Sequence, residues 1–325
     1  MGNDINGLHH VGHIVHDMGQ AMDHYRRLGF TVAAPAYPLL PRVAGGAAEP
    51  FGVANAHVQF PRNFIELVAV IGEAGRMPGE ARPIPLQVPD DRLPGLLAAI
   101  NATTANIASF LQRFQGLHIM IADTPDIDGI AAGLTAAGVD HAGVHAVQRP
   151  VETRTGTSME PVRYLEISAT GLPAGRVPEG RLGFAENAPV QLSGAVHPNG
   201  ATGLVEGVLC VADETLPALK QRYATYFGQA RDGRPHSFDR ANVTVVTAST
   251  LGDLLPGERP AALPAFVACT VSVRDIAATR RLLHDNDVQV NRTGRGEIFV
   301  PARAALGAAI IFRQQDEGLS VGEVT

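Results

Sequence analysis

Apolar and polar residues alternate along this chain in a pattern that repeats four times. Each repeat opens with an apolar, strand-like run, continues through an aspartate into an amphipathic helix, and closes at a turn residue. The four strand–helix units cover residues 8–30, 117–138, 204–228 and 266–288. Aspartate is a typical helix cap because its side chain accepts a hydrogen bond from the first free backbone amides. The periodicity therefore predicts four related units.

Further strand-like runs, rich in β-branched and aromatic residues, follow each predicted helix. They cover residues 30–35, 56–63, 64–71, 139–148, 162–169, 242–249, 297–301 and 308–314. Each unit is therefore roughly strand–helix–strand–strand–strand. The predicted fold class is α+β, with four βαβββ modules in one chain.

Two stretches interrupt the repeat. Within residues 72–115, apolar residues recur at helical spacing, which predicts an inserted amphipathic helix at about 92–114. Residues 171–202 are rich in proline and glycine and indicate a linker. We therefore expect a two-module N-terminal domain over 1–170, a two-module C-terminal domain over 203–315, and a tail over 316–325.

The composition narrows the class of protein. Apolar residues make up 45% of the 325 residues, enough for a large core, and the formal charge is −6. A mildly acidic chain without a basic block excludes general nucleic-acid binding, which depends on clustered cations. Cys210 and Cys269 are too few for a disulfide scaffold or a thiolate zinc site. No apolar run approaches the ~20 residues that cross a bilayer, and the N-terminus lacks a signal pattern, so we expect a cytoplasmic protein without membrane contact.

Four short motifs carry a resemblance to a known superfamily. They are LHHVGHIVHD with His10, NFIELVAV with Glu66, GLHIMIAD with His118, and VRYLEIS with Glu166. In these motifs the chain resembles the vicinal oxygen chelate superfamily, which includes glyoxalase I, methylmalonyl-CoA epimerase, extradiol dioxygenases and antibiotic-resistance proteins. The resemblance implies that the modules pair into two curved, open mixed sheets. It also implies one divalent metal ion in the N-terminal pair, bound by His10, Glu66, His118 and Glu166, with one ligand from the first and one from the last strand of each module.

The residues themselves agree with that implication. His10 and Glu66 are 56 residues apart, and His118 and Glu166 are 48 apart, as two copies of one module require. Two imidazoles and two carboxylates suit zinc first, with nickel, cobalt, manganese or iron as other options. Glu66 and Glu166 each lie between apolar neighbours, where a carboxylate is costly unless it is paired or metal-bound. The simpler interpretations are an ordinary strand histidine at His10, with His9 as its main competitor, and glutamates on solvated strand faces.

The C-terminal units lack an equivalent set. Glu206 precedes Asp213 by seven residues, as His10 precedes Asp17, so Glu206 stands in the place of His10. The same register favours His10 over His9 as the ligand. The last strands of these units offer no carboxylate, and we expect the C-terminal domain to be free of metal. The resemblance places the iron of four-module extradiol dioxygenases in the C-terminal pair, so this departure counts against ring cleavage.

Other polar residues are candidates for contacts with a substrate. His57 and Gln59 share one face of the strand that precedes Glu66. Tyr164 lies where its hydroxyl could donate a hydrogen bond, and Arg154 could hold an anionic or polyol substrate. The competing interpretations are a solvated strand face, ordinary packing and a surface arginine.

The resemblance and the donor set together predict a reaction. A metal-chelated carbonyl makes the adjacent C–H acidic, and a glutamate removes the proton, with Glu66 and Glu166 as base and acid. We therefore expect a metal-dependent epimerase or isomerase of a small oxygenated ketone, similar to keto-cyclitol epimerases. The alternatives are a glyoxalase-type lyase, an extradiol-type dioxygenase with Fe(II), and a non-catalytic protein that binds a small molecule such as a drug. A small-molecule substrate is the expected partner, and a homodimer is one expectation for assembly.

Overall fold

The repeating pattern folds into modules that each begin with a strand and a helix. The computed structural model describes residues 5–72, 79–153, 156–187, 195–228, 237–238 and 241–315. The N-terminal modules contain β1 (Gly7–Ile14), α1 (Met18–Arg27), β2 (Ala36–Pro41), β3 (Ala48–Pro50), β4 (Val53–Gln59), β5 (Phe64–Val70), β6 (Arg82–Pro85), α2 (Leu93–Arg113), β7 (Gly116–Asp123), α3 (Ile127–Ala136), β8 (His145–Thr153), β9 (Gly156–Glu166) and β10 (Arg181–Asn187). The C-terminal modules contain β11 (Ala201–Val211), η1 (Asp213–Thr215), α4 (Leu216–Phe227), β12 (Ser237–Phe238), β13 (Val243–Thr247), α5 (Leu251–Leu254), β14 (Ala265–Val273), α6 (Ile276–Asp285), β15 (Asn291–Arg292), β16 (Ile298–Val300), η2 (Ala302–Ala304) and β17 (Ala309–Gln314).

Aspartate side chains start three of the four module helices. Asp17 caps α1 and accepts a hydrogen bond from the Gln20 amide at 2.8 Å. Asp126 caps α3, and Asp275 caps α6, in the same way. Because the first amides of a helix have no partner within the helix, these caps fix where each helix begins. In the third module Asp213 instead opens the short helix η1, which leads into α4.

The N-terminal sheet is built around the first strands of its two modules. β1 pairs in parallel with β5, and β7 pairs in parallel with β10, so that each module brings its first and last strands together. β1 and β7 are antiparallel neighbours and join the modules. The strand order across the face is therefore β4-β5-β1-β7-β10-β9-β8.

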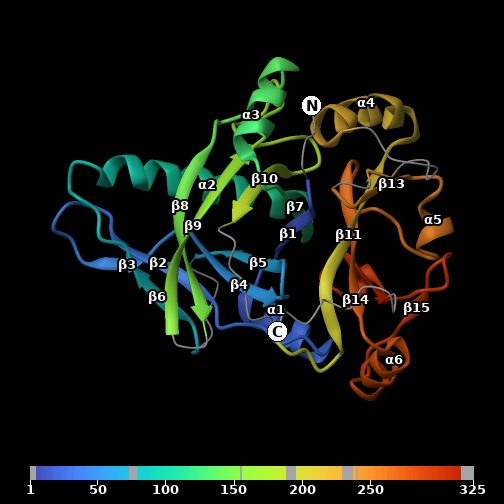
Figure 1. Ribbon diagram of the computed structural model, residues 1–325. Helices are drawn as coiled ribbons and strands as arrows, with labels where there is room; N and C mark the ends of the chain where they lie inside the picture. Colours follow the sequence, from blue (N-terminus) through green and yellow to red (C-terminus); the bar gives the residue numbers. More distant parts are fainter. Residues whose placement is uncertain are drawn as a thin grey trace, which may run out of the picture.

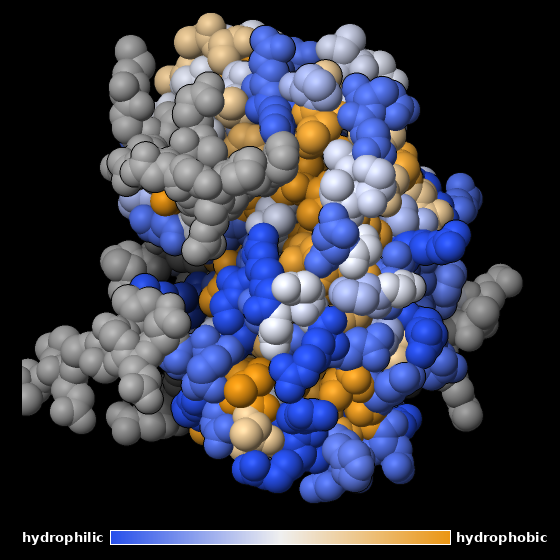
Figure 2. Space-filling view, turned by 90° about the vertical axis from the view of Figure 1, so that its right-hand side faces the viewer, coloured by the Kyte–Doolittle hydropathy of each residue, from blue (hydrophilic) through white to orange (hydrophobic). Residues whose placement is uncertain are grey.

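The C-terminal sheet repeats this arrangement. β11 is parallel to β13, β14 is parallel to β17, and β11 and β14 are antiparallel neighbours. Phe266 in β14 pairs with Leu117 in β7 and links the two sheets. The halves lie side by side in Figure 1, and Figure 2 shows a band of apolar side chains between polar flanks on the side formed by the C-terminal half. The predicted α+β class with paired modules and open mixed sheets is confirmed.

The two faces of the N-terminal sheet are covered differently. Helices α1 and α3 pack on one face and share the main hydrophobic core with α4 and α6. On the other face, Ile107 and Phe110 of α2 pack against Ile14, Val68 and Ile121. The predicted inserted helix is thus present as α2, and it covers only part of this second face. The uncovered part is where polar side chains gather.

The linker predicted over 171–202 differs from what the structure contains. Residues 181–187 form β10, which pairs with both β7 and β9 and is the last strand of the second module. Its apolar positions, Leu182 and Phe184, are fully buried. The strand is short and is flanked by proline- and glycine-rich turns, so these turns dominate the sequence pattern. The predicted tail, 316–325, lies outside the described residues.

Among the described helices, none is both long and apolar enough to cross a membrane.

Candidate functional site

The uncovered part of the N-terminal sheet carries a row of polar side chains on β4. Asn55, His57 and Gln59 alternate with buried Ala56 and Val58. Because successive side chains of a strand point to opposite faces, these three polar residues share the face that α2 leaves open. His57 pairs with Glu66 of β5 in the sheet register. Two predicted substrate residues, His57 and Gln59, therefore lie beside the predicted base.

Glu66 is surrounded by nitrogen atoms. The Asn55 amide donates a hydrogen bond of 2.8 Å to its Oε1. His57 Nε2 lies 3.9 Å from Oε1, and His10 Nε2 lies 3.9 Å from Oε2. The Glu66 side chain is 16% exposed, so water still reaches it. The carboxylate thus lies on the open face of the sheet, where it is partly exposed, and an imidazole lies near each of its two oxygens.

The surroundings of Glu66 favour the protonated form of its carboxyl. Burial raises the pKa of the Glu66 carboxyl to about 7, and the positive charge of Arg181 offsets this only in part. Desolvation disfavours the charged form of a carboxyl, which explains the direction of the shift. A carboxyl with a pKa near neutrality can both accept and return a proton at physiological pH. Glu66 therefore has the property that a general base requires.

His10 is held in place by its neighbours on the same face. Its ring stacks on Phe64 with centroids 4.7 Å apart and an interplanar angle of 6°. His10 Nδ1 lies 2.7 Å from His9 Nδ1, a hydrogen bond whose direction depends on the tautomers. These contacts aim the Nε2 atom of His10 toward Glu66.

The structure gives the His118 side chain partners other than His10 and Glu66. His118 Nε2 lies 2.8 Å from the Phe114 carbonyl oxygen, and the ring stacks on Phe110 of α2 at 5.0 Å. Burial lowers the pKa of His118 to about 4, with the charges of Arg113 and Arg176 acting in the same direction. The neutral ring thus donates from Nε2 to a backbone carbonyl at the end of α2, while its Nδ1 is buried without a hydrogen-bond partner among the described residues.

The sheet register explains why His118 and His10 are not equivalent. In the pairing of β1 with β7, His9 and His118 have no residue opposite them. Each is the extra residue of a β-bulge. Each of them also lies eight residues before the aspartate that caps the next helix. His118 is therefore the counterpart of His9, and Ile119 is the counterpart of His10.

The second glutamate also occupies a different strand from the one predicted. Glu166 lies in β9 and pairs with Gly183 of β10, as His57 of β4 pairs with Glu66 of β5. Glu166 is therefore the counterpart of His57, and the second module has Gly183 where the first has Glu66. The Glu166 carboxylate forms an ion pair with Arg181.

These placements decide how well the residues fit the divalent metal that the family implies. Among the described residues, no group of three or more His, Cys, Asp or Glu side chains has the arrangement of a metal site. His10, His57 and Glu66 come nearest, with the Nε2 atom of each histidine 3.9 Å from a Glu66 oxygen, but all three belong to the first module, whereas His118 and Glu166 of the second module have other partners. The predicted four-ligand set is therefore not assembled among the described residues.

A metal measurement tests this placement. Protein incubated with excess zinc and then dialysed is expected to retain well below one equivalent by mass spectrometry, with no difference between the wild type and His118→Ala. One equivalent of zinc that is lost in both His118→Ala and Glu166→Gln would restore the predicted ligand set. Stoichiometric iron in the purified protein would instead favour the dioxygenase alternative.

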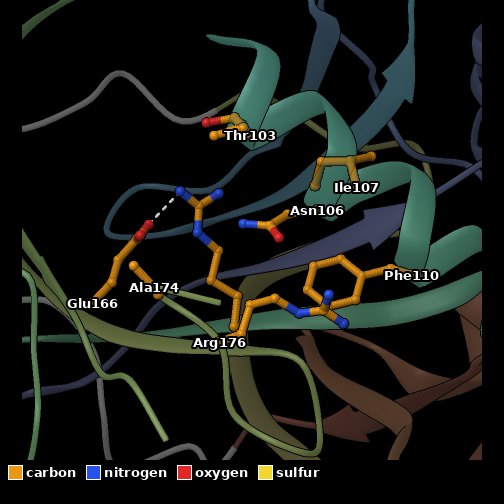
Figure 3. Close-up of a pocket in the computed structure, with 10 residues that line it drawn as sticks. Thr103, Asn106, Ile107, Phe110, Glu166, Ala174 and Arg176 are labelled. Atoms are coloured by element: carbon orange, nitrogen blue, oxygen red, sulfur yellow. Dashed lines mark ion pairs between the residues drawn. The ribbon is translucent and has the colours of Figure 1, made fainter. Parts of the chain in front are cut away.

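A small pocket lies next to Glu166, between α2 and residues 174–176. It has a volume of about 120 Å³ and is lined by Thr103, Asn106 and Phe110 of α2 together with Glu166, Arg176 and Arg181. Figure 3 shows the ion pair of Glu166 at one side of the pocket and Arg176 beneath the Phe110 ring. Gly175 permits this close approach, because it has a φ of +72° and a Cβ there would lie 2.5 Å from Glu166 Oε2.

The remaining predicted substrate residues have mixed positions. Gln59 pairs with Phe64 at the end of β4, on the open face. The Tyr164 ring is tilted by 31° against the His145 ring, with centroids 5.4 Å apart, and burial together with the Glu166 charge raises the pKa of its hydroxyl. Arg154 lies outside the described residues.

Sequence reasoning missed several polar residues of this face. Asn55 continues the alternation that carries His57 and Gln59, and that alternation could have identified it. Arg181 and Arg176 lie in the stretch predicted as a linker, and no feature of the local sequence distinguishes them from surface arginines.

In the C-terminal half, Glu206 belongs to a network of charges. Its side chain is 9% exposed and accepts hydrogen bonds from Thr244 and Arg313, while Arg295 lies 3.5 Å away. Burial alone would raise the pKa of Glu206, but the Thr244 hydrogen bond and the Arg313 charge hold it below its usual value. Glu206 is thus an ionised carboxylate bound by side chains of its own domain.

Comparison with known proteins identifies the family. A family model described as a glyoxalase-like domain matches residues 8–227. A hypothetical protein from Staphylococcus aureus aligns with a TM-score of 0.53 at 11% identity, over 95% of this chain and 99% of that chain. A variant of 4-hydroxymandelate synthase from Streptomyces coelicolor aligns with a TM-score of 0.54 at 12% identity, over 98% of this chain and 95% of that chain. Methylmalonyl-CoA epimerase from Mycobacterium tuberculosis aligns with a TM-score of 0.33 at 19% identity, over 58% of this chain and 93% of that chain.

No curated protein matches the chain. Identities as low as those of the solved structures show a shared fold and not a shared reaction. The family model, however, spans both N-terminal modules and the beginning of the third. This chain therefore belongs to the glyoxalase-like domain family, within the vicinal oxygen chelate superfamily.

Proposed function

We propose that this protein is an epimerase or isomerase that moves a proton on a carbon next to the carbonyl of a small oxygenated ketone. Glu66 is the base. The observation that supports the proposal is the carboxyl of Glu66 itself, which is partly enclosed on an open sheet face and has a pKa raised by burial to about 7. A group that exchanges a proton at neutral pH, placed where a small molecule can reach it, suits proton abstraction.

The chain supplies groups for each part of that reaction. When Glu66 takes the proton from carbon, the electron pair of the C–H bond moves toward the carbonyl oxygen, which becomes negative. A cation on the same face stabilises this developing charge, and Arg181 is the cation whose field reaches Glu66. Asn55 keeps the Glu66 carboxyl oriented through its 2.8 Å hydrogen bond.

Return of the proton decides the outcome. If Glu66 returns it to the neighbouring carbon, the product is an isomer. If a second acid protonates the opposite face of the first carbon, the product is an epimer. Glu166 is the second carboxyl on this face, and we propose it for that role. Once its ion pair with Arg181 has opened, Glu166 takes a proton from water and delivers it to the carbon, while Glu66 releases its proton to water.

Substrate class and cell location complete the proposal. A sugar- or cyclitol-like ketone fits the polar side chains Asn55, His57 and Gln59 that surround Glu66. Cys210 and Cys269 are both free and buried, which agrees with a reducing compartment such as the cytoplasm. The homodimer stays a prediction.

Deuterium incorporation tests the proposal even when the product is unidentified. The protein is incubated in D₂O with a panel of keto-sugars, keto-cyclitols and hydroxyketones, and the C–H signals are followed by NMR. We expect catalysed loss of the signal next to the carbonyl of at least one compound. A lyase would instead consume a second reactant, a dioxygenase would consume oxygen, and a binding protein would shift ligand signals without exchange; any of these results in place of exchange would contradict the proposal.

A further inference from the structure

The pocket beneath α2 has more positive than negative charge in its lining. Arg176 and Arg181 both line it, and Glu166 is its one carboxylate among the described residues. Glu166 is already occupied by its ion pair with Arg181. The lining therefore has an excess of one positive charge, which an anion of single charge would balance.

Arg176 is the cation in this lining that pairs with no described carboxylate. No ion pair joins its guanidinium to another described residue, and its Nε atom is buried without a hydrogen-bond partner in that part of the chain. A buried donor without a partner costs stability, so such donors in native proteins usually meet a ligand or water. The guanidinium is held in position by the Phe110 ring, whose centroid lies 4.7 Å from Cζ.

Further positive charge lies nearby. Arg113 and Arg176 both act on His118, and Arg176 also lowers the pKa of Arg113, after the larger effect of burial on each. Arg113 donates to the Pro264 carbonyl, a neutral acceptor, at 2.8 Å. Glu179 opposes this effect at Arg113, but Glu179 is itself paired with Arg222. The field in the pocket is therefore set by Arg176 and Arg181 of its lining, and it favours an anion.

The rest of the lining indicates what kind of anion. Ile107, Phe110 and Ala174 supply apolar surface, and Asn106 and Thr103 supply an amide and a hydroxyl. An inorganic anion would leave the apolar side uncovered, whereas a short carbon chain would contact it. The volume of about 120 Å³ is below the roughly 300 Å³ of pockets for drug-sized ligands, so the ligand is a small molecule or one end of a larger one.

We propose that this pocket is a binding site for a small organic carboxylate, which Arg176 and Arg181 hold by its two oxygens and Asn106 contacts from α2. Two guanidinium groups match the planar geometry of a carboxylate. Arg181 also acts electrostatically on Glu66, so we propose that a keto acid held by Arg181 is within the field of the base. Only this last step, in which the bound acid is the substrate, rests on the proposed function.

Calorimetric titration with pyruvate and with its methyl ester tests the proposal. Both probes carry the same carbonyl, and only pyruvate carries the negative charge. We expect pyruvate to bind at one site per chain and the ester at least about tenfold more weakly, because charged hydrogen bonds are lost. Arg176→Gln is expected to weaken pyruvate binding by at least about tenfold as well. Equal binding of the two probes, or tighter binding of inorganic phosphate than of pyruvate, would overturn the proposal.

Arg92→Gln is the matched control. Arg92 precedes α2, the helix that lines the pocket, and is exposed, so the substitution removes one positive charge outside the pocket. It lies 10 residues before Ala102, the first residue of α2 that lines the pocket. That spacing is about 15 Å along the helix, beyond the ~8 Å screening length in physiological salt. Pyruvate binding is expected to stay within about twofold of the wild type. If Arg92→Gln and Arg176→Gln weakened pyruvate binding equally, the net charge of the protein would explain the loss, and the proposed site would be wrong.

Two further variants help to interpret a loss of pyruvate binding. One distinguishes it from misfolding, and the other distinguishes it from a loss of catalysis. If Arg176→Gln unfolds at a lower temperature, Asn106→Ala provides a second variant, and unchanged pyruvate binding in it would count against the site. Glu66→Gln is expected to bind pyruvate as the wild type does. Binding without deuterium exchange on any substrate would contradict the proposed function alone, whereas exchange without pyruvate binding would contradict the carboxylate site alone.

Discussion

Replacing Glu66 by glutamine is expected to lower the rate of deuterium incorporation by about 10²- to 10⁴-fold, the usual contribution of a positioned general base. Glutamine keeps the shape of the side chain and its hydrogen bond with Asn55, but it cannot accept a proton. The folded structure is expected to persist, so the loss should appear in turnover and not in ligand binding. The measurement is the exchange rate under saturating ketone for the two proteins side by side.

Glu49→Gln serves as its control. Glu49 lies on β3 of the same module, is exposed, and forms an ion pair only with exposed Arg42 among the described residues. Exchange in this variant is expected to match the wild type. An unchanged rate in Glu66→Gln, with substrate still bound, would remove Glu66 from the reaction.

Replacing Glu179 by alanine is expected to lower the free energy of unfolding by about 3 to 5 kcal/mol, the typical cost of removing one partner from a buried ion pair. Glu179 is fully buried and accepts two hydrogen bonds from Arg222, at 2.6 and 2.8 Å, and one from the Tyr223 hydroxyl at 2.8 Å. These bonds join the turn before β10 to α4 of the third module. Without the carboxylate, the guanidinium and the buried hydroxyl lose their shared acceptor. Chemical denaturation of the two proteins measures the difference.

Asp128→Ala is the comparison that gives this prediction its specificity. Asp128 also pairs with an arginine, Arg163, but its side chain is 71% exposed. Exposed pairs contribute about 1 kcal/mol or less, so its removal is expected to change stability only slightly. If both variants lost the same stability, burial would not explain the strength of the Glu179 contacts.

Local patterns predicted the larger features of the fold. The four strand–helix units, the caps Asp17, Asp126 and Asp275, and the inserted helix α2 all follow from short-range periodicity and capping chemistry. The apolar neighbours of Glu66 within β5 also marked its carboxylate as one that needs a partner. These features depend on residues within a few positions of one another, which a sequence displays directly.

The register between strands could not be predicted in the same way. A β-bulge shifts a strand by one residue, and the bulges at His9 and His118 decide which histidine faces the open side. The sequence of one strand does not show where a β-bulge occurs in the strand paired with it. The same limit applies to Glu166, because β10 is enclosed between turns and the sequence pattern therefore assigns Glu166 to the last strand of its module.

Ion pairs between residues far apart in the chain could not be predicted from the sequence either. Arg181 meets Glu166 from the neighbouring strand, and Arg176 reaches the pocket from a turn between β9 and β10. An arginine in a glycine- and proline-rich segment looks the same whether it faces solvent or a pocket. The tertiary structure is what distinguishes the two cases.

The proposed reaction requires that Glu66 carry an exchangeable proton near neutral pH. Difference infrared spectroscopy of the wild type against Glu66→Gln measures this directly, because a protonated carboxyl has its own carbonyl band. We expect a band at pH 5 that is absent from the variant and disappears with a midpoint near pH 7, since burial raises the pKa of Glu66 to about 7. A midpoint near the ordinary glutamate value of about 4.3 would contradict the account, because Glu66 would then be fully ionised at neutral pH and too weak a base.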